Sequence, residues 1–141
     1  MQYLRCKWDI DYELDKLIFE HQLYEGIPEL YIRNRARALI RKLFQKLNGN
    51  VALRGGGEHA FEIMSALPLT EREKITYILD KNSKNSSFIF PECIAITPVQ
   101  YVNGKYPIDY IVIASYKNKQ EMINSLSDCI DRVQIIDLYE Y

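Results

Sequence analysis

Apolar and polar residues follow two different rhythms along the chain, and the change comes at Gly49. Before it, apolar residues recur at the three- and four-residue spacing of amphipathic helices, over residues 11–23 and 30–47. After it, short apolar runs alternate with helical patterns. This change predicts an N-terminal helical extension, residues 1–48, followed by an α/β domain, residues 49–141.

The extension is expected to contain two helices. Gly26 and Pro28 interrupt the first pattern, and Asn48-Gly49 closes the second pattern as a C-cap would. The polar face of the second helix is basic and contains Arg33, Arg35, Arg37, Arg41, Lys42 and Lys46. Such a face either contacts phosphates or acidic partners, or is simply solvated, and the solvated face is the commoner case.

Five short apolar runs in the C-terminal part have the composition of strands. They cover residues 51–53, 75–79, 93–96, 110–114 and 133–136. Helical patterns follow the first and fourth runs, at residues 60–67 and 119–126, and residues 81–87 are expected to form a polar loop. Strands that alternate with helices pair in parallel through right-handed crossovers. We therefore expect a Rossmann-like parallel sheet of about five strands, in the order 3-2-1-4-5.

Composition excludes several classes of protein. The 18 basic and 19 acidic residues leave a net charge of -1, so no overall field attracts nucleic acid or an anionic membrane. The three cysteines are odd in number and far apart, which predicts reduced thiols without a metal site. No apolar run approaches the roughly 20 residues needed to cross a bilayer. We expect a cytoplasmic protein without a metal, a membrane span or a nucleic-acid partner.

The turn after the first predicted strand points to a phosphate-containing ligand. It reads Gly55-Gly56-Gly57-Glu58-His59-Ala60. The first, third and sixth residues match the fingerprint G-x-G-x-x-G/A, between a strand and a helix as the fingerprint requires. Gly55 would permit the tight turn, Gly57 would let a phosphate approach the backbone, and Ala60 would let the helix pack closely on the sheet. Amide N–H groups and the helix dipole then favour an anion at this place.

Three ionisable residues modify this prediction. Asp80 ends the second strand, where such folds place a carboxylate that binds a ribose diol. Glu58 adds a negative charge to the first helical turn and would oppose a pyrophosphate unless its side chain points away. His59 is the candidate catalytic residue, since a histidine can donate to a phosphate or carry a proton near neutral pH. A histidine at a helix end without a chemical task is an equally good interpretation.

Further candidates lie at the carboxyl ends of the strands, where doubly wound sheets bind their ligands. They are Arg54, Thr97, Ser115 and Tyr116. Ser115 is favoured, because the crevice of such a sheet lies between its first and fourth strands. Tyr101 and Lys105 have the spacing of the Tyr/Lys pair of short-chain dehydrogenases. Asn103-Gly104 predicts a turn between them, so we interpret this match as chance.

Residues 51–60, 78–82 and 109–116 together resemble the NAD(P)-binding-like Rossmann domains of bacterial sugar enzymes. These domains include the nucleotide-sugar-binding part of PglD-type sugar acetyltransferases and modules beside glycosyltransferases and methyltransferases of surface-polysaccharide pathways. The resemblance implies that the glycine turn and His59 face a sugar nucleotide or its pyrophosphate, and that Asp80 meets the ribose. Such turns often read Gly-Ala-Gly, whereas this chain has Gly56, and no left-handed β-helix transferase domain follows Tyr141.

Three functions are compatible with the sequence. The first is a module that binds a nucleotide-sugar or an NAD(P)-type dinucleotide through Gly55, Gly56, Gly57, His59, Asp80 and Ser115. The second is a small nicotinamide-dependent oxidoreductase or epimerase-like enzyme. The third is a Rossmann-fold interaction domain with an empty site, whose N-terminal helices contact a second copy or a partner enzyme. The sequence contains no evident catalytic pair, which favours the binding module.

Overall fold

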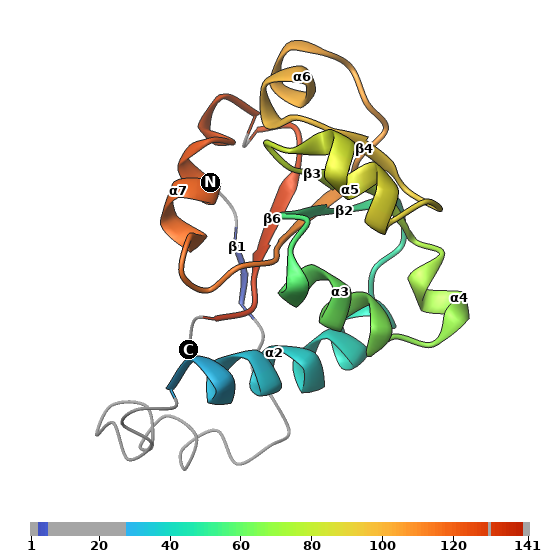
Figure 1. The fold of residues 1–141 in the computed structure, drawn as a ribbon, viewed down its shortest axis with the longest axis vertical. Helices are drawn as coiled ribbons and strands as arrows, with labels where there is room; N and C mark the ends of the chain where they lie inside the picture. Colours follow the sequence, from blue (N-terminus) through green and yellow to red (C-terminus); the bar gives the residue numbers. More distant parts are fainter. Residues whose placement is uncertain (1–2, 6–27, 130, 140–141) are drawn as a thin grey trace.

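The computed structural model describes residues 3–5, 28–129 and 131–139, and its strands form a six-stranded parallel sheet (Figure 1). The strands are β1 (Tyr3–Arg5), β2 (Val51–Arg54), β3 (Ile75–Leu79), β4 (Ile94–Ile96), β5 (Tyr110–Ile113) and β6 (Gln134–Asp137). The helices are α2 (Pro28–Phe44), α3 (Glu58–Ser65), α4 (Leu69–Arg72), α5 (Ser83–Ile89), α6 (Pro98–Asn103) and α7 (Lys119–Asn124), with a 3-10 turn at Ser127–Cys129. The strand order is β1-β6-β5-β2-β3-β4.

Five of these strands confirm the predicted fold class. Numbered from β2, they follow the order 3-2-1-4-5, and all are parallel. The sequence did not predict β1, which pairs with β6 at the edge of the sheet, Tyr3 opposite Ile135. Three residues are too few for a periodic signal. The helix expected over residues 11–23 lies outside the described residues.

The helices cover the sheet in two layers. The strand order runs one way from β2 to β4 and the other way from β5 to β6. Because parallel crossovers are right-handed, this reversal sends α3 and α5 to one face, and α6 and α7 to the other. Helix α2 packs beside α3 (Figure 1). The reversal creates a switch point between β2 and β5 at the carboxyl end of the sheet.

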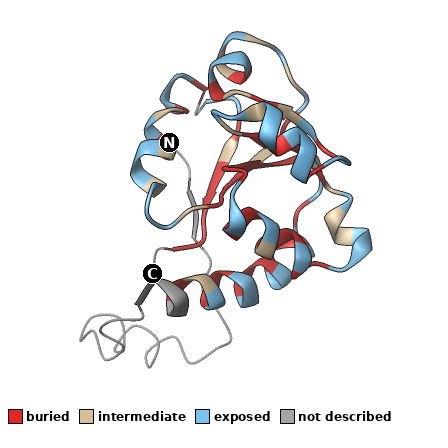
Figure 2. Ribbon diagram, in the orientation of Figure 1, coloured by how far each residue is buried: buried red, intermediate tan, exposed pale blue. Residues whose placement is uncertain are grey.

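The buried residues form one core that includes α2. The central strands β2 and β5 and the inner sides of α2 and α3 are buried in Figure 2. On α2 the buried apolar residues are Ile32, Ala36, Leu39, Ile40, Leu43 and Phe44. They belong to the same cluster as the central strands β2 and β5. The apolar face of α2 therefore contacts the α/β core of its own chain, while the boundary between residues 48 and 49 stays a prediction.

The polar loop predicted for residues 81–87 is wrong, because α5 occupies most of it. Asn82 is the N-cap of α5, and its side-chain oxygen accepts a hydrogen bond from the amide of Asn85 at 3.2 Å. Ser86 is completely buried. Asparagine and serine favour turns as isolated residues, but the same side chains cap helices. Here the cap and the burial of Ser86 favour the helix.

Helix α6 was also not predicted, although its start has a sequence signal. Thr97 and Gln100 form a capping box, with Pro98 in the first turn. The helix ends at Asn103, so Lys105 does not share it with Tyr101. Tyr101 is buried against Tyr106. Tyr101 and Lys105 therefore do not form a Tyr/Lys pair on one helix, although their spacing matches that of short-chain dehydrogenases.

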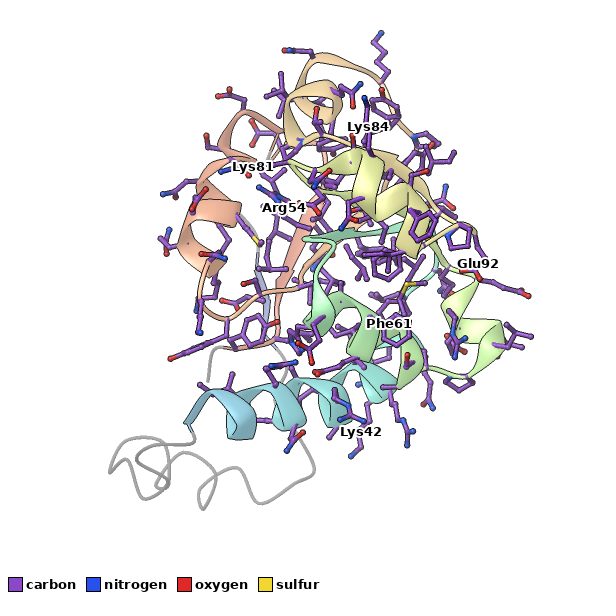
Figure 3. All side chains as sticks on the ribbon, in the orientation of Figure 1. Lys42, Arg54, Phe61, Lys81, Lys84 and Glu92 are labelled. Atoms are coloured by element: carbon purple, nitrogen blue, oxygen red, sulfur yellow. The ribbon has the colours of Figure 1, made fainter. Side chains whose placement is uncertain are left out.

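The basic face of α2 is solvated only in part. Arg41 donates from Nε to the carbonyl oxygen of Ala66 at 2.7 Å, and Arg35 donates to the carbonyl oxygen of Leu138 at 3.3 Å. Lys42 points outward from the helix (Figure 3). Arg35 and Arg41 thus fasten α2 to the rest of the core. In the described part of the chain, no helix has the length and apolar character needed to span a membrane.

Candidate functional site

An open pocket of about 510 Å³ lies at the carboxyl ends of β2, β3 and β5, beside the switch point. The residues that line it are Arg33, Gly55, Gly56, Gly57, Glu58, His59, Asp80, Asn82, Asn85, Ala114, Ser115, Tyr116, Lys117, Asn118 and Met122. They come from α2, from the glycine turn, and from the segments that follow β3 and β5. The fold thus brings together parts of the chain that are far apart in sequence.

All six residues predicted to bind a ligand line this pocket, together with Tyr116. Two weaker candidates do not. Thr97 caps α6. Arg54 is buried between β3 and α7 (Figure 3), where it donates to the carbonyl oxygen of Leu79 at 3.4 Å and to Ser125 Oγ at 3.3 Å. Burial lowers the pKa of Arg54, and the charges of Asp80 and Glu121 offset this only in part.

Gly55 makes the turn that the fingerprint requires. Its φ of +113° lies in the region that only glycine adopts readily. Its amide donates to the carbonyl oxygen of Leu79 at 2.8 Å, which ties the turn to the end of β3. A Cβ at this position would also lie 3.1 Å from the methyl group of Met122.

Gly56 and Gly57 differ in what surrounds them. A Cβ added to Gly56 would lie 2.1 Å from Ser86 Oγ and 2.7 Å from Asp80 Oδ2, so the turn has no room for a side chain here. This contact is a structural reason for a glycine at position 56. A Cβ added to Gly57 would meet nothing within 4 Å. The backbone of Gly57 is therefore open on the side where a ligand would approach.

The N-terminus of α3 has unsatisfied donors at the same place. Gly57 is its N-cap, and no side chain caps the helix there. The first four N–H groups of an α-helix have no partner within the helix. The positive end of the helix dipole adds to them. An uncapped start of this kind favours a small anion.

Asp80 lies beside the turn in a fixed position. Its Oδ2 accepts a hydrogen bond from Ser86 Oγ at 2.7 Å, and its amide donates to the carbonyl oxygen of Ile96 at 3.0 Å. Ser86 reaches Asp80 because α5 begins directly after β3. The carboxylate is thus held against the glycine turn, with Oδ1 as a further acceptor.

His59 is part of a charged network between α3 and α2. Its Nδ1 lies 3.3 Å from Glu62 Oε2, and Glu62 in turn accepts hydrogen bonds from Nε and Nη2 of Arg33. Burial lowers the pKa of His59, and the hydrogen bond to Glu62 offsets this only in part. Burial alone would raise the pKa of Glu62, but the hydrogen bonds from His59 and Arg33 outweigh it and lower that pKa. The network therefore holds a neutral histidine beside an ionised glutamate.

Glu58 lines the pocket with an exposed side chain. This side chain is 83% exposed, and its Oε1 lies 3.7 Å from Arg33 Nη2. The carboxylate thus faces a cation of α2 at ion-pair distance. This placement weakens the repulsion that its position in the first helical turn would impose on a phosphate.

Ser115 and Tyr116 line the pocket after β5, and Tyr139 lies behind Tyr116. Tyr116 packs edge-on against Tyr139, with ring centroids 6.0 Å apart, and the Tyr139 ring lies 5.7 Å from that of His59. Ser115 Oγ accepts a hydrogen bond from the amide of Asn118 at 3.2 Å and so shapes the loop before α7. This part of the site combines aromatic surface with polar atoms.

Sequence reasoning missed several residues of the site. Asn82 has the signature of an N-cap before α5, which the sequence could have revealed. Arg33 was named only as part of a basic helix face, and Ser86 only as part of a loop, because α2 and α5 place them beside the turn only in the folded chain. Among the described residues, no group of three or more His, Cys, Asp or Glu is arranged to hold a metal ion.

Comparisons of the chain with models of protein families, with curated proteins and with solved structures find no match.

Proposed function

We propose that the pocket binds a nucleotide ligand, with a phosphate group next to Gly57 and a ribose next to Asp80. One observation carries this proposal. A single pocket at the switch point combines an open glycine backbone, an uncapped helix N-terminus and a fixed carboxylate at the end of the neighbouring strand. Each of these features has a complementary group in a nucleotide.

In this proposal, binding of the ligand's phosphate group depends on backbone N–H groups rather than on the net charge of the pocket. Two cations, Arg33 and Lys117, and two carboxylates, Glu58 and Asp80, line the pocket, so their charges balance. The N–H groups at the start of α3 and the helix dipole would supply the attraction for an anion. The free space at Gly57 lets a phosphate oxygen come within hydrogen-bonding distance of them.

Binding of the ligand's ribose depends on Asp80. Because Ser86 fixes the carboxylate through Oδ2, little conformational freedom is lost when a ligand binds. A carboxylate can accept hydrogen bonds from both hydroxyl groups of a ribose. This arrangement favours ligands with a free ribose diol.

The size of the pocket suits a small molecule, since such sites usually measure about 300–1,000 Å³. Within this proposal the ligand is a nucleotide-sugar or an NAD(P)-type dinucleotide. The resemblance of residues 51–60, 78–82 and 109–116 to modules of bacterial sugar enzymes favours a nucleotide-sugar in a cytoplasmic surface-polysaccharide pathway.

A thermal-shift panel tests the proposal. The full chain is heated with NAD, NADP, UDP-glucose, S-adenosylmethionine or coenzyme A, and its Tm is compared with that of the free protein. A ligand at 100 times its Kd adds about 2.7 kcal/mol of stability, so the class that binds raises Tm by several degrees. If none raises Tm at millimolar concentration, the proposal fails and an interaction domain with an empty site is favoured.

Gly57→Val is the matched variant for this panel. Its φ of −88° and ψ of −163° suit a β-branched residue, and the space beside it is free, so the Tm of the unliganded variant should stay close to that of the parent. The valine would occupy the place of the phosphate and remove the ligand-induced shift. Asp80→Asn still accepts from Ser86, and it should weaken only ligands with a free ribose diol. A full shift with Gly57→Val would contradict the phosphate position.

A further inference from the structure

Tyr116 is the one phenol ring among the described residues that line the pocket. It is 37% exposed, and it packs edge-on against Tyr139, which is buried. Tyr139 is held in turn, because its amide donates to Oδ1 of Asp137 at 2.9 Å. The Tyr116 ring thus has a supported orientation, and little conformational freedom is lost when a ligand packs on it.

The neighbours of Tyr116 in the pocket are polar. Ser115 and Asn118 lie on the same loop and line the pocket with it, together with Lys117. Ser115 Oγ accepts a hydrogen bond from the amide of Asn118 at 3.2 Å, so its hydroxyl hydrogen can still be donated. The side-chain amide of Asn118 can both donate and accept. This loop therefore offers the pocket one aromatic ring together with several hydrogen-bonding groups.

Three features follow one another along the carboxyl ends of the strands. Strand β2 lies between β3 and β5. Asp80 follows β3, Gly57 follows β2, and Tyr116 follows β5. With a ribose at Asp80 and a phosphate at Gly57, the group on the other side of the phosphate extends toward Tyr116. This order rests on the proposed function, because it takes the positions of the ribose and the phosphate as given.

We propose that Tyr116 packs against the face of a sugar ring that the phosphate links to the ribose, which makes the ligand a nucleotide-sugar. A pyranose ring has C–H groups on its faces and hydroxyl groups around its edge. Its face would contact the Tyr116 ring, and its hydroxyl groups would bond to Ser115 and Asn118. An aromatic ring such as nicotinamide also has apolar faces, but it has only a carboxamide to bond to these polar side chains.

Three phosphate monoesters test the proposal without assuming a nucleobase. Methyl phosphate has no ring, glucose 1-phosphate has a pyranose ring, and phenyl phosphate has an aromatic ring. NMR titrations of the full chain follow the Gly57 amide, which reports on the phosphate. Glucose 1-phosphate should bind about fivefold more tightly than methyl phosphate, and also more tightly than phenyl phosphate. Its C–H protons should shift upfield, as protons above an aromatic ring do.

Variants identify the ring that is responsible. Tyr116→Ala should reduce the preference for glucose 1-phosphate to less than about twofold and remove the upfield shift, whereas Tyr116→Phe should keep both. The affinity for methyl phosphate should be the same in both variants as in the parent. Phe88→Ala is the matched control, because Phe88 is an exposed aromatic residue that does not line the pocket. Asp80→Asn should also leave the preference unchanged, because a sugar at Tyr116 does not contact Asp80.

The outcomes separate this inference from the proposed function. If the esters shift the Gly57 amide but glucose 1-phosphate has no advantage, or keeps its advantage in Tyr116→Ala, the sugar contact is wrong while the phosphate site stands. A preference for phenyl phosphate over glucose 1-phosphate would also overturn the sugar contact and would favour a dinucleotide. Loss of the preference in Asp80→Asn would mean that the sugar lies at Asp80 instead. If no ester affects the Gly57 amide, the proposed function fails together with this inference.

Discussion

The charge of His59 depends on whether the chain is folded. Several ionisable groups face its ring: Glu62 on α3, Arg33 and Arg37 on α2, and Tyr139 after β6. Burial is the largest influence and lowers the pKa of His59 below the ordinary value of 6.5. The unfolded chain therefore binds a proton at a higher pH than the folded chain does.

This difference predicts how stability changes with pH. As pH falls below about 6.5, the unfolded state binds a proton that the folded state does not, so the free energy of unfolding falls. The uptake of one proton lowers the free energy of unfolding by at most about 1.4 kcal/mol per pH unit. Glu62 acts in a lower window, since its stabilisation is present above pH 4.5 and is lost below its own lowered pKa. In His59→Gln the decline between pH 6.5 and 5 should be shallower, as measured by urea unfolding.

His21→Gln is the control for this experiment. Because this variant keeps His59, it should also keep the contribution of His59 to the pH dependence of the free energy of unfolding. An unchanged slope in His59→Gln would mean that the histidine is as accessible to protons in the folded chain as in the unfolded chain.

The sequence predicted the pocket residues that belong to a local motif. Gly55, Gly57 and Asp80 were found because a strand, a turn and a helix place them at fixed spacing. The role of Gly56 was not predictable, since it depends on Ser86, which α5 places beside the turn. The placement of Arg54 also differs, because its side chain turns into the interior toward Ser125. Contacts between distant segments leave no periodic signal.

At the scale of elements, α2 holds α3 at its middle and at its C-terminal end. Arg33 binds Glu62 in the middle of α3, and Arg41 binds the carbonyl oxygen of Ala66, the C-cap of α3. The last carbonyl groups of a helix lack partners within it, and a cation there also suits the helix dipole. These contacts fix the orientation of the helix whose N-terminus borders the pocket.

Arg41→Met tests this fastening. It removes the hydrogen bond and keeps an apolar stem, so the free energy of unfolding should fall by about 1.5–3 kcal/mol, the usual contribution of a hydrogen bond to a charged group. Arg37→Met on the same helix removes the same charge from an exposed position and should change stability by less than about 0.5 kcal/mol. Chemical denaturation measures both. Equal effects would show that charge, and not the contact with Ala66, matters.

The elements that the sequence predicted share a strong apolar pattern. The helix α2 and the five strands from β2 to β6 have buried faces that their spacing reveals. The element α5 was missed because its residues are mostly polar, and β1 because a three-residue edge strand gains its order from a partner far along the chain.

At the scale of the whole molecule, α2 and the sheet share one core. Leu39 of α2 and Ile78 of β3 are both completely buried and belong to the same cluster. Domains with a common core unfold together. The residues before and after the predicted boundary between 48 and 49 should therefore unfold together in one transition.

Leu39→Ala and Ile78→Ala test this expectation. Each should lower the free energy of unfolding by about 2–5 kcal/mol, and far- and near-ultraviolet circular dichroism should still report one coincident transition. Leu69→Ala, at a side chain that is 68% exposed, should change stability by less than about 0.5 kcal/mol. A separate early transition in Leu39→Ala would indicate that α2 unfolds on its own.

The pairing of β1 with β6 also has a consequence for biosynthesis. Tyr3 is translated long before its partner Ile135. Since β6 lies between β1 and β5, the nascent chain cannot dock its first strand until translation has passed residue 137. The backbone groups of β1 must meanwhile rely on water or on a chaperone.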